Sequence, residues 1–118
     1  MRSYRQMDVW NSAMDLVLQI YQVTSTFPPT ETYGLQAQMR RSALSVPSNI
    51  AEGWGSGAQR RYVQMLKVAR GSLMELETQC ILAHRLGYIC QEVMENILKM
   101  THRITCMLNR LIKVLTRP

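Results

Sequence analysis

Residues 27–57 read FPPTETYGLQAQMRRSALSVPSNIAEGWGSG and contain the pattern that decides the fold. Two adjacent prolines open this stretch, and three glycines close it. Pro47 lies in the middle, where its missing N–H and its ring are expected to kink a helix. Between the prolines and the glycines, apolar residues recur at spacings of three and four, which is typical of one helix face: Leu35, Met39, Ala43, Val46 and Ile50.

Three further segments carry the same helical spacing. The first begins near Asp8, an acidic residue that suits a helix N-terminus, and ends before Pro28. In the other two, apolar residues recur without interruption at alternating spacings of four and three, and Gly87 separates these two segments. Strand patterns are absent, and Thr30 is a plausible N-cap for the second helix. We therefore expect one all-α domain over residues 1–118, an up-down-up-down antiparallel four-helix bundle, with a loose arm over residues 1–7 and helices over about 8–26, 30–53, 58–86 and 91–115.

Composition limits the class of protein. The chain has 118 residues, 47% of them hydrophobic, which suits a single globular core. No apolar run has the length of a membrane span, and the residues after Met1 lack the apolar segment of a signal peptide. Three cysteines, an odd number, indicate reduced thiols and a cytoplasmic protein.

The net charge of +6 is unevenly distributed. Residues 31–70 hold six basic and two acidic side chains. Residues 71–95 hold one basic and four acidic side chains, and residues 96–118 hold five basic side chains and no acidic one. The basic residues of these segments form two groups. The first consists of Arg40, Arg41, Arg60, Arg61, Lys67 and Arg70. The second lies on one line of the last helix, opposite its apolar row, and consists of Lys99, Arg103, Arg110, Lys113 and Arg117.

Both groups are candidate phosphate-contacting surfaces. Arginine can grip phosphate with two donors, and the release of counterions would supply affinity that is independent of sequence. The alternative interpretation is a solvated helix face with no binding function, since every amphipathic helix needs a polar side. Few aromatic residues near these groups could stack on bases, which favours contact with the nucleic-acid backbone over single-strand recognition: Tyr4, Tyr33, Trp54 and Tyr62.

Catalytic patterns are missing from the sequence. There is no Glu-x-x-His pair and no nucleophile elbow, and the glycines of GWGSG follow no strand. We therefore expect neither an enzyme nor a cofactor.

Two cysteine–histidine pairs, Cys80–His84 and His102–Cys106, have the i, i+4 spacing that lets each chelate a metal from one helical face. In a hairpin of the last two helices, however, the pairs would lie about 12 Å apart. Cys80 is also a core position, so no shared metal site is expected.

The polar side of the segment around Pro47 consists of Ser45, Ser48, Asn49 and Glu52. One expected role is to satisfy the carbonyl group that Pro47 leaves without a donor. The other is hydrogen bonding across a helix or subunit interface, where Arg41 and Glu52 would add a contact.

Three segments carry a family resemblance: F-P-x-x-E-x-Y-G-L at 27–35, RSA-x-SVPSNIAEG at 41–53 and ARGSL-x-ELE at 69–77. Together they resemble the bacterial four-helix-bundle family of 23S rRNA intervening-sequence proteins, also called S23 ribosomal proteins. The chain also looks like a relative of the accessory variability protein of diversity-generating retroelements.

The resemblance implies a bundle that assembles into a ring of five subunits, with relatives whose basic rings bind nucleic acid and reverse transcriptase. It further implies that the residues matching the motif build the fold and the subunit contacts: Arg41, Ser45, Pro47, Asn49, Glu52, Arg70, Gly71, Ser72 and Glu77. A glycine inside a helix costs about 1 kcal/mol relative to alanine, and a close helix approach would explain Gly71. The basic line of the last helix is not part of this motif.

We therefore expect a non-enzymatic, ring-shaped homo-oligomer, pentameric by resemblance, that binds RNA or DNA through its basic surfaces. The alternative is a protein-interaction scaffold whose basic surface meets an acidic protein. A redox or metal-binding bundle is a third, weaker option. A membrane partner is not expected.

Overall fold

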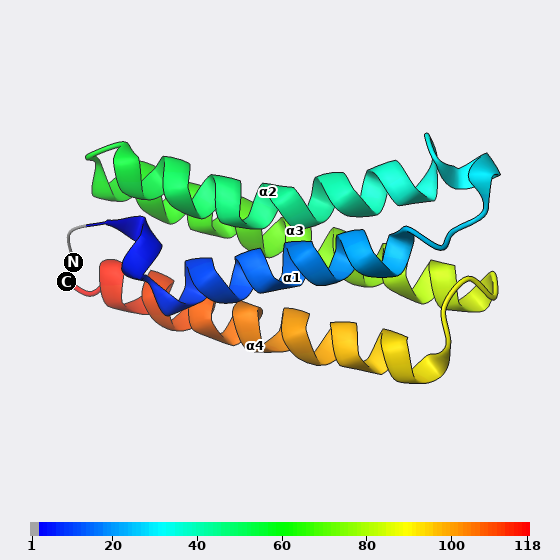
Figure 1. Cartoon of the computed structure of the whole chain (residues 1–118). Helices are drawn as coiled ribbons and strands as arrows, with labels where there is room; N and C mark the ends of the chain where they lie inside the picture. Colours follow the sequence, from blue (N-terminus) through cyan, green and yellow to red (C-terminus); the bar gives the residue numbers. More distant parts are fainter. Residues whose placement is uncertain (1–2) are drawn as a thin grey trace.

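The fold, given by a computed structural model that describes residues 3–118, consists of four α-helices running alternately up and down (Figure 1). These are α1 (Asp8–Thr24), α2 (Leu35–Gly55), α3 (Gln59–Arg85) and α4 (Gln91–Leu115). Short 3₁₀ helices, η1 (Tyr4–Gln6) and η2 (Pro29–Glu31), precede α1 and α2. Residues 3–118 contain no strand, so the expected all-α fold with four helices is confirmed.

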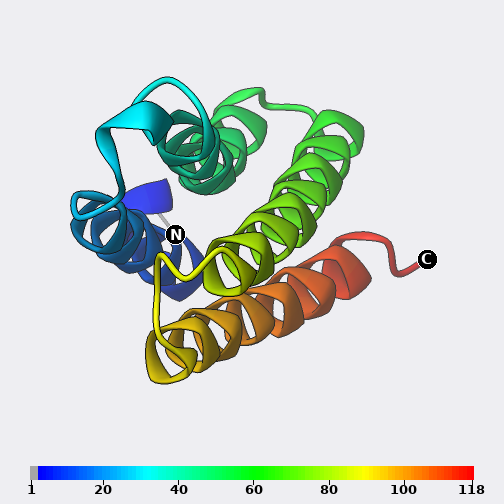
Figure 2. The same ribbon diagram turned by 90° about the vertical axis from the view of Figure 1, so that its right-hand side faces the viewer.

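Each helix packs against the next, and α4 packs back against α1, so that all four surround one core (Figure 2). The rod measures 47 × 22 × 20 Å. The start of α1, the turn between α2 and α3 and the end of α4 lie at the same end of it (Figure 1). The largest fully buried apolar side chains come from all four helices: Leu16, Ile20, Met39, Val46, Ile50, Leu66, Leu73, Leu76, Ile97, Ile104 and Leu108. Within the described chain, no helix has both the length and the apolar character needed to cross a membrane.

Helix α2 begins at Leu35, five residues after the N-cap expected at Thr30. Thr30 instead lies inside η2, and the capping side chain is that of Glu31. One carboxylate oxygen of Glu31 accepts the Leu35 N–H at 2.9 Å, and the other accepts the Tyr88 hydroxyl at 2.9 Å. Glu31 therefore both starts α2 and ties the α1–α2 connection to the α3–α4 connection.

The N-terminal segment is more ordered than the loose arm expected over residues 1–7. Residues 1–2 lie outside the part that the structure describes. The ring of Tyr4, in η1, packs edge-on against Trp10 and Trp54, with centroid distances of 5.3 and 6.1 Å, and Met7 is buried. This segment therefore covers the end of the bundle.

Gly87 stops α3 as expected from the sequence. Its φ is +82°, a left-handed conformation that favours glycine. The Gly87 N–H donates to the His84 carbonyl and the Tyr88 N–H to the Ala83 carbonyl, both at 2.9 Å. This is the Schellman arrangement, which satisfies carbonyls at the helix end.

Helices α2 and α3 approach each other closely at Gly53. A Cβ atom at this position would lie 2.8 Å from the Cβ of Met65 and 3.2 Å from the Cα of Tyr62. Neither atom is the flexible end of a side chain, so any other residue would push the helices apart.

We therefore expect Gly53→Ala to lower the free energy of unfolding by about 1–3 kcal/mol, the usual cost of overpacking. Gly55→Ala is the matched control, because a Cβ there meets nothing within 4 Å. Chemical unfolding followed by circular dichroism measures both. An equal effect of the two substitutions would contradict the close approach at Gly53.

Glu31 gives the stability a pH dependence. Hydrogen bonds lower the pKa of its carboxyl below the usual 4.5, first that from the Leu35 N–H and then that from the Tyr88 hydroxyl. Because the pKa is lower in the folded state, the ionised Glu31 contributes its full stabilisation at pH values above its pKa in the unfolded chain. This stabilisation is lost as the pH falls through the pKa of Glu31 in the folded protein. Wild type should therefore exceed Glu31→Gln in stability at neutral pH, and the gap should close below pH 4.5. Unfolding curves at several pH values test this, and a gap that does not change with pH would contradict it.

Candidate nucleic-acid interface

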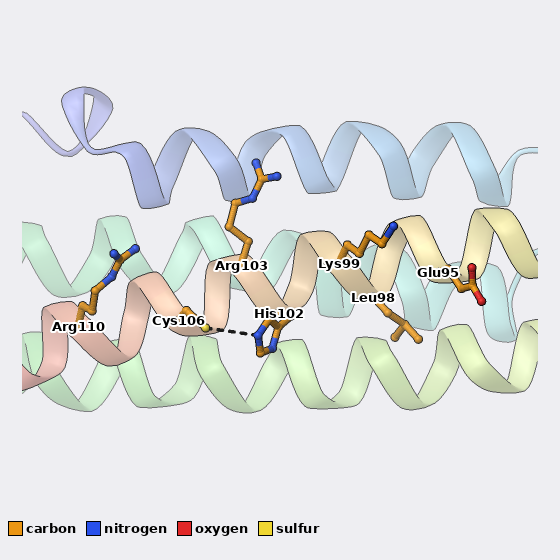
Figure 3. Close-up of a pocket in the computed structure, with 7 residues that line it drawn as sticks. All are labelled: Glu95, Leu98, Lys99, His102, Arg103, Cys106 and Arg110. Atoms are coloured by element: carbon orange, nitrogen blue, oxygen red, sulfur yellow. Dashed lines mark hydrogen bonds between the residues drawn. The ribbon is translucent and has the colours of Figure 1, made fainter.

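The basic line of α4 lies on the outside of the bundle. Its five residues, Lys99, Arg103, Arg110, Lys113 and Arg117, are all exposed. The four that belong to α4 lie opposite the buried row that begins at Ile97, as the helical spacing indicates. Arg117, expected on the same helix, instead follows two residues after α4 ends at Leu115. Figure 3 shows Lys99, Arg103 and Arg110 extending toward the side of α4 that faces α1. Arg103 also borders a small hollow together with Asp15 of α1.

Three basic residues of α3 join this line. Arg60 and Lys67 line one hollow with Leu115 and Thr116 at the end of α4. Arg70 donates to the side-chain oxygen of Asn109 on α4 at 2.9 Å. We call the combined surface the basic flank, and it consists of Arg60, Lys67, Arg70, Lys99, Arg103, Arg110, Lys113 and Arg117. Arg61 is exposed but points about 100° away from Arg60 around the helix.

Arg40 and Arg41 do not belong to this surface. The hydrogen bond between Ser45 and Ser72 places Arg41 near the middle of α3, about 25 Å along the bundle from the first residues of α3. The expectation that all six arginines and lysines of residues 40–70 form one group is therefore corrected. The start of α3 lies next to the end of α2, whereas Arg40 and Arg41 lie in the first half of α2.

Arg40 holds α1 against α2. Its Nε donates to the hydroxyl of buried Thr24 at 2.9 Å, and its guanidinium donates to the Tyr21 carbonyl at 3.2 Å. The guanidinium carbon also lies 4.5 Å from the centre of the Tyr21 ring. These contacts give Arg40 a structural role, which the sequence did not reveal because Thr24 and Tyr21 lie in another helix.

The aromatic side chains do not form a stacking platform on the basic flank. The Tyr62 hydroxyl donates to the sulfur of Met7 at 3.4 Å, and burial raises the pKa of this tyrosine. Tyr4 and Trp54 pack on each other. Tyr33 is 95% exposed but belongs to the connection at the opposite end of the bundle. The described part of the flank therefore presents charged side chains that could contact phosphates, and no aromatic rings that could stack on bases.

The motif residues around Pro47 connect α2 to α3. The hydroxyls of Ser45 and Ser72 share a hydrogen bond of 2.8 Å across the two helices. The Asn49 amide donates to the carbonyl and the hydroxyl of Ser45, at 2.7 and 2.8 Å. Of the two roles expected for these residues, bonding across a helix interface is the one observed for Ser45. Pro47 is buried, and α2 continues through it to Gly55.

Other motif residues divide into internal and external positions. A carboxylate oxygen of Glu77 accepts the hydroxyl of buried Thr101 at 2.6 Å, which connects α3 to α4. Thr101 was missed from the sequence, although a threonine between Ile97 and Ile104 on the apolar row was a signal. Arg41, Glu52 and Gly71 are exposed. A Cβ at Gly71 would meet nothing within 4 Å, so no helix of the same chain explains this glycine.

The two cysteine–histidine pairs differ in environment. Cys80 is fully buried, and burial, followed by the charge of Glu77, raises the pKa of its thiol to about 11. His102 and Cys106 are both exposed on α4. Among residues 3–118, no three His, Cys, Asp or Glu side chains are grouped so that they could hold a metal ion.

The unequal roles of neighbouring arginines can be tested by stability. Arg40→Ala should lower the free energy of unfolding by about 1–2 kcal/mol, because it removes charged hydrogen bonds and a cation–π contact. Arg41→Ala should leave it nearly unchanged, since this side chain is exposed. Parallel urea titrations compare the variants, and equal midpoints would argue against the contacts of Arg40.

Comparisons with known proteins agree with this architecture. One solved structure is described as a protein with unknown function from the S23 ribosomal protein family of Bacteroides thetaiotaomicron. It matches with a TM-score of 0.82 and 23% identity, over 89% of this chain and 98% of that one, which shows a shared fold. No curated protein matches the chain. The family model described as 23S rRNA-intervening sequence protein matches residues 5–110. The chain therefore belongs to the 23S rRNA-intervening sequence protein family.

Proposed function

We propose that this protein is a non-enzymatic, homo-oligomeric helical bundle that binds nucleic acid, RNA or DNA, through the basic flank. The observation that carries the proposal is the division of charge on α3 and α4. Residues 59–70 and 96–118 hold nine basic side chains and no acidic one, whereas residues 71–95 hold four acidic side chains and one basic one. The Arg70–Asn109 hydrogen bond and the bond from the Gln59 amide to the Leu115 carbonyl bring these basic halves side by side.

The chemistry of this surface favours contact with phosphates. Lys99 and Lys113 are 14 positions apart on one helix, which corresponds to about 21 Å of length. A straight basic ridge of that length can follow a nucleic-acid backbone, and counterion release makes such binding independent of base sequence. The lack of aromatic rings on the described flank supports this mode over base stacking.

Homo-oligomerisation accounts for the outer face of α3. Val68, Leu82 and Leu86 are each about half exposed on that face, with Gly71 between them. A glycine inside a helix costs about 1 kcal/mol relative to alanine. A neighbouring subunit packed closely against Gly71 would explain why this cost is tolerated. We propose the ring of five subunits that the family resemblance implies, in which each subunit repeats the basic flank and so raises avidity.

The proposed protein works without catalysis and in the cytoplasm. Free cysteines at positions 80, 90 and 106 support a reducing compartment. Several polar residues of the motif, Ser45, Asn49, Ser72 and Glu77, are engaged in hydrogen bonds within or between helices, which supports a structural use of them.

Charge reversal on α4 tests nucleic-acid binding. Arg103→Glu, Arg110→Glu and Lys113→Glu combined should weaken binding to a labelled RNA hairpin and a DNA duplex. The salt dependence should also fall, by a slope of about 0.9 for each phosphate of a duplex that the variant no longer neutralises. Fluorescence anisotropy at low and near-physiological salt measures both quantities. Arg85→Glu is the matched control, an exposed arginine in the acidic half of α3.

Light scattering on the same samples separates binding from assembly. Wild type and both variants should show the mass of a pentamer of the 13.6-kDa chain. A monomer mass for wild type would overturn the oligomer. Absence of binding by wild type at low salt would overturn the nucleic-acid function and favour the scaffold for an acidic protein.

A further inference from the structure

Cys106 lies in the middle of the basic line of α4. Arg103 precedes it by three positions and Arg110 follows it by four, so the three residues share one face of the helix. Figure 3 shows Cys106 between the two arginines along α4, with a dashed contact to His102. The thiol is free and exposed. A nucleophilic group thus lies among the cations that are proposed to contact phosphates.

The surroundings of Cys106 favour an anion. The open hollow beside it has a volume of about 700 Å³ and is lined by three cationic side chains, those of Lys99, Arg103 and Arg110. One carboxylate, that of Glu95, also lines the hollow. It belongs to a residue eleven positions from Cys106, about 16 Å away along the helix. Positive charge therefore dominates the hollow next to the thiol.

His102 gives the thiol a proton acceptor. Its Nε2 atom lies 3.6 Å from the sulfur of Cys106, one helical turn along α4. In the neutral tautomer that leaves Nε2 unprotonated, the ring can take the proton that the thiol must lose before it reacts as a thiolate. Reactive cysteines occur in electropositive, partly exposed surroundings of this kind. The cluster therefore combines a nucleophile, a base and a surface that attracts anions.

The other two cysteines lack this combination. Cys80 is fully buried, and burial raises the pKa of its thiol to about 11. Cys90 is exposed. The hollow beside it is lined by two carboxylates, those of Glu92 and Glu95, and by one cation, Lys99. Because like charges repel, an anionic reagent is disfavoured there. The chain therefore presents two exposed thiols in surroundings of opposite charge.

We propose that Cys106 is a modification site for a small anionic disulfide of the glutathione type. His102 takes the thiol proton and passes it to solvent, and the Cys106 thiolate attacks one sulfur of the disulfide. The S–S bond of the disulfide breaks, and the leaving sulfur departs as a thiolate that takes up a proton. The disulfide is thereby reduced, and Cys106 is oxidised to a mixed disulfide, which a reducing thiol reverses.

The modification also regulates the nucleic-acid binding proposed above, and this part of the inference rests on that function. Glutathione carries more carboxylates than ammonium groups, so its adduct places a net negative charge between Arg103 and Arg110. The added carboxylates pair with these arginines and repel phosphates. The basic line is then interrupted at its centre.

Two disulfides of opposite charge test the modification site, oxidised glutathione as the anion and cystamine as the cation. Mass spectrometry of the full chain measures the rate of adduct formation at Cys106 and at Cys90 with each of them at low salt. Oxidised glutathione should react about fivefold faster at Cys106, the factor that one contact between unit charges gives in water. Cystamine should not share this preference, and high salt should remove it.

Substitutions separate the role of charge from that of the base. Arg103→Gln combined with Arg110→Gln should remove the preference of oxidised glutathione for Cys106 without slowing the reaction with cystamine. His102→Ala should slow the reaction of Cys106 with both disulfides. Arg85→Gln is the matched control and should change neither rate. Because all of these side chains are exposed, circular dichroism should show that the variants stay folded.

Three results would overturn the modification site. The first is an equal rate of reaction with oxidised glutathione at Cys106 and Cys90. The second is a preference for Cys106 that the two arginine substitutions leave unchanged. The third is an unchanged rate at Cys106 in His102→Ala, which would remove the proposed proton acceptor.

Fluorescence anisotropy with a labelled RNA hairpin tests the regulatory part. The glutathione adduct should weaken binding by about fivefold, the effect of one lost contact between unit charges, and a reducing thiol should restore it. Cys106→Ser should bind like wild type and should not respond to oxidised glutathione. An adduct that binds as tightly as the unmodified protein would overturn the regulation. Absence of binding by the unmodified protein would instead overturn the proposed function, whereas a preferential adduct at Cys106 would still support the modification site.

Discussion

The close contact between α2 and α3 is the constraint on which the bundle depends. At Gly53 the two helices are so near that a side chain would meet the Cβ of Met65. Farther along the same contact, Ser45 and Ser72 share a hydrogen bond that positions one helix along the other. A polar pair of this kind inside a helix contact is stable only when its partners are satisfied, and Asn49 completes the set. The contact therefore sets the register and the rotation of α3.

The rotation of α3 decides where its remaining residues lie. With Ser72 directed at α2 and Glu77 directed at Thr101 of α4, Val68, Gly71 and Leu82 are left on the outer face. The register with α4 places Arg70 beside Asn109 and so joins the basic halves of the two helices. One set of helix contacts thus produces both the apolar face proposed for assembly and the charged flank proposed for nucleic acid.

Residues that look equivalent in the sequence differ once packing is known. Arg40 and Arg41 are adjacent, but each step along a helix turns the side chain by about 100°, so that one faces α1 and the other faces solvent. The two cysteine–histidine pairs share one spacing, yet Cys80 is buried and Cys106 is exposed. Desolvation disfavours a thiolate in the core, whereas water stabilises it at the surface. Spacing defines a candidate site, and burial decides its chemistry.

The sequence by itself determined the four helices, their antiparallel order and the outward position of the basic line on α4. These features follow from apolar periodicity, from prolines and glycines at helix ends, and from short connections, all of which act locally. The bonding of Glu31, the contacts of Arg40 and the partner of Glu77 were decided only by tertiary structure. Each depends on side chains of another segment, such as Tyr88, Thr24 and Thr101, which no local pattern specifies. The sequence also could not show whether another helix packs against Gly71, because that depends on how pairs of helices are arranged. In the structure, the space beside Gly71 is open.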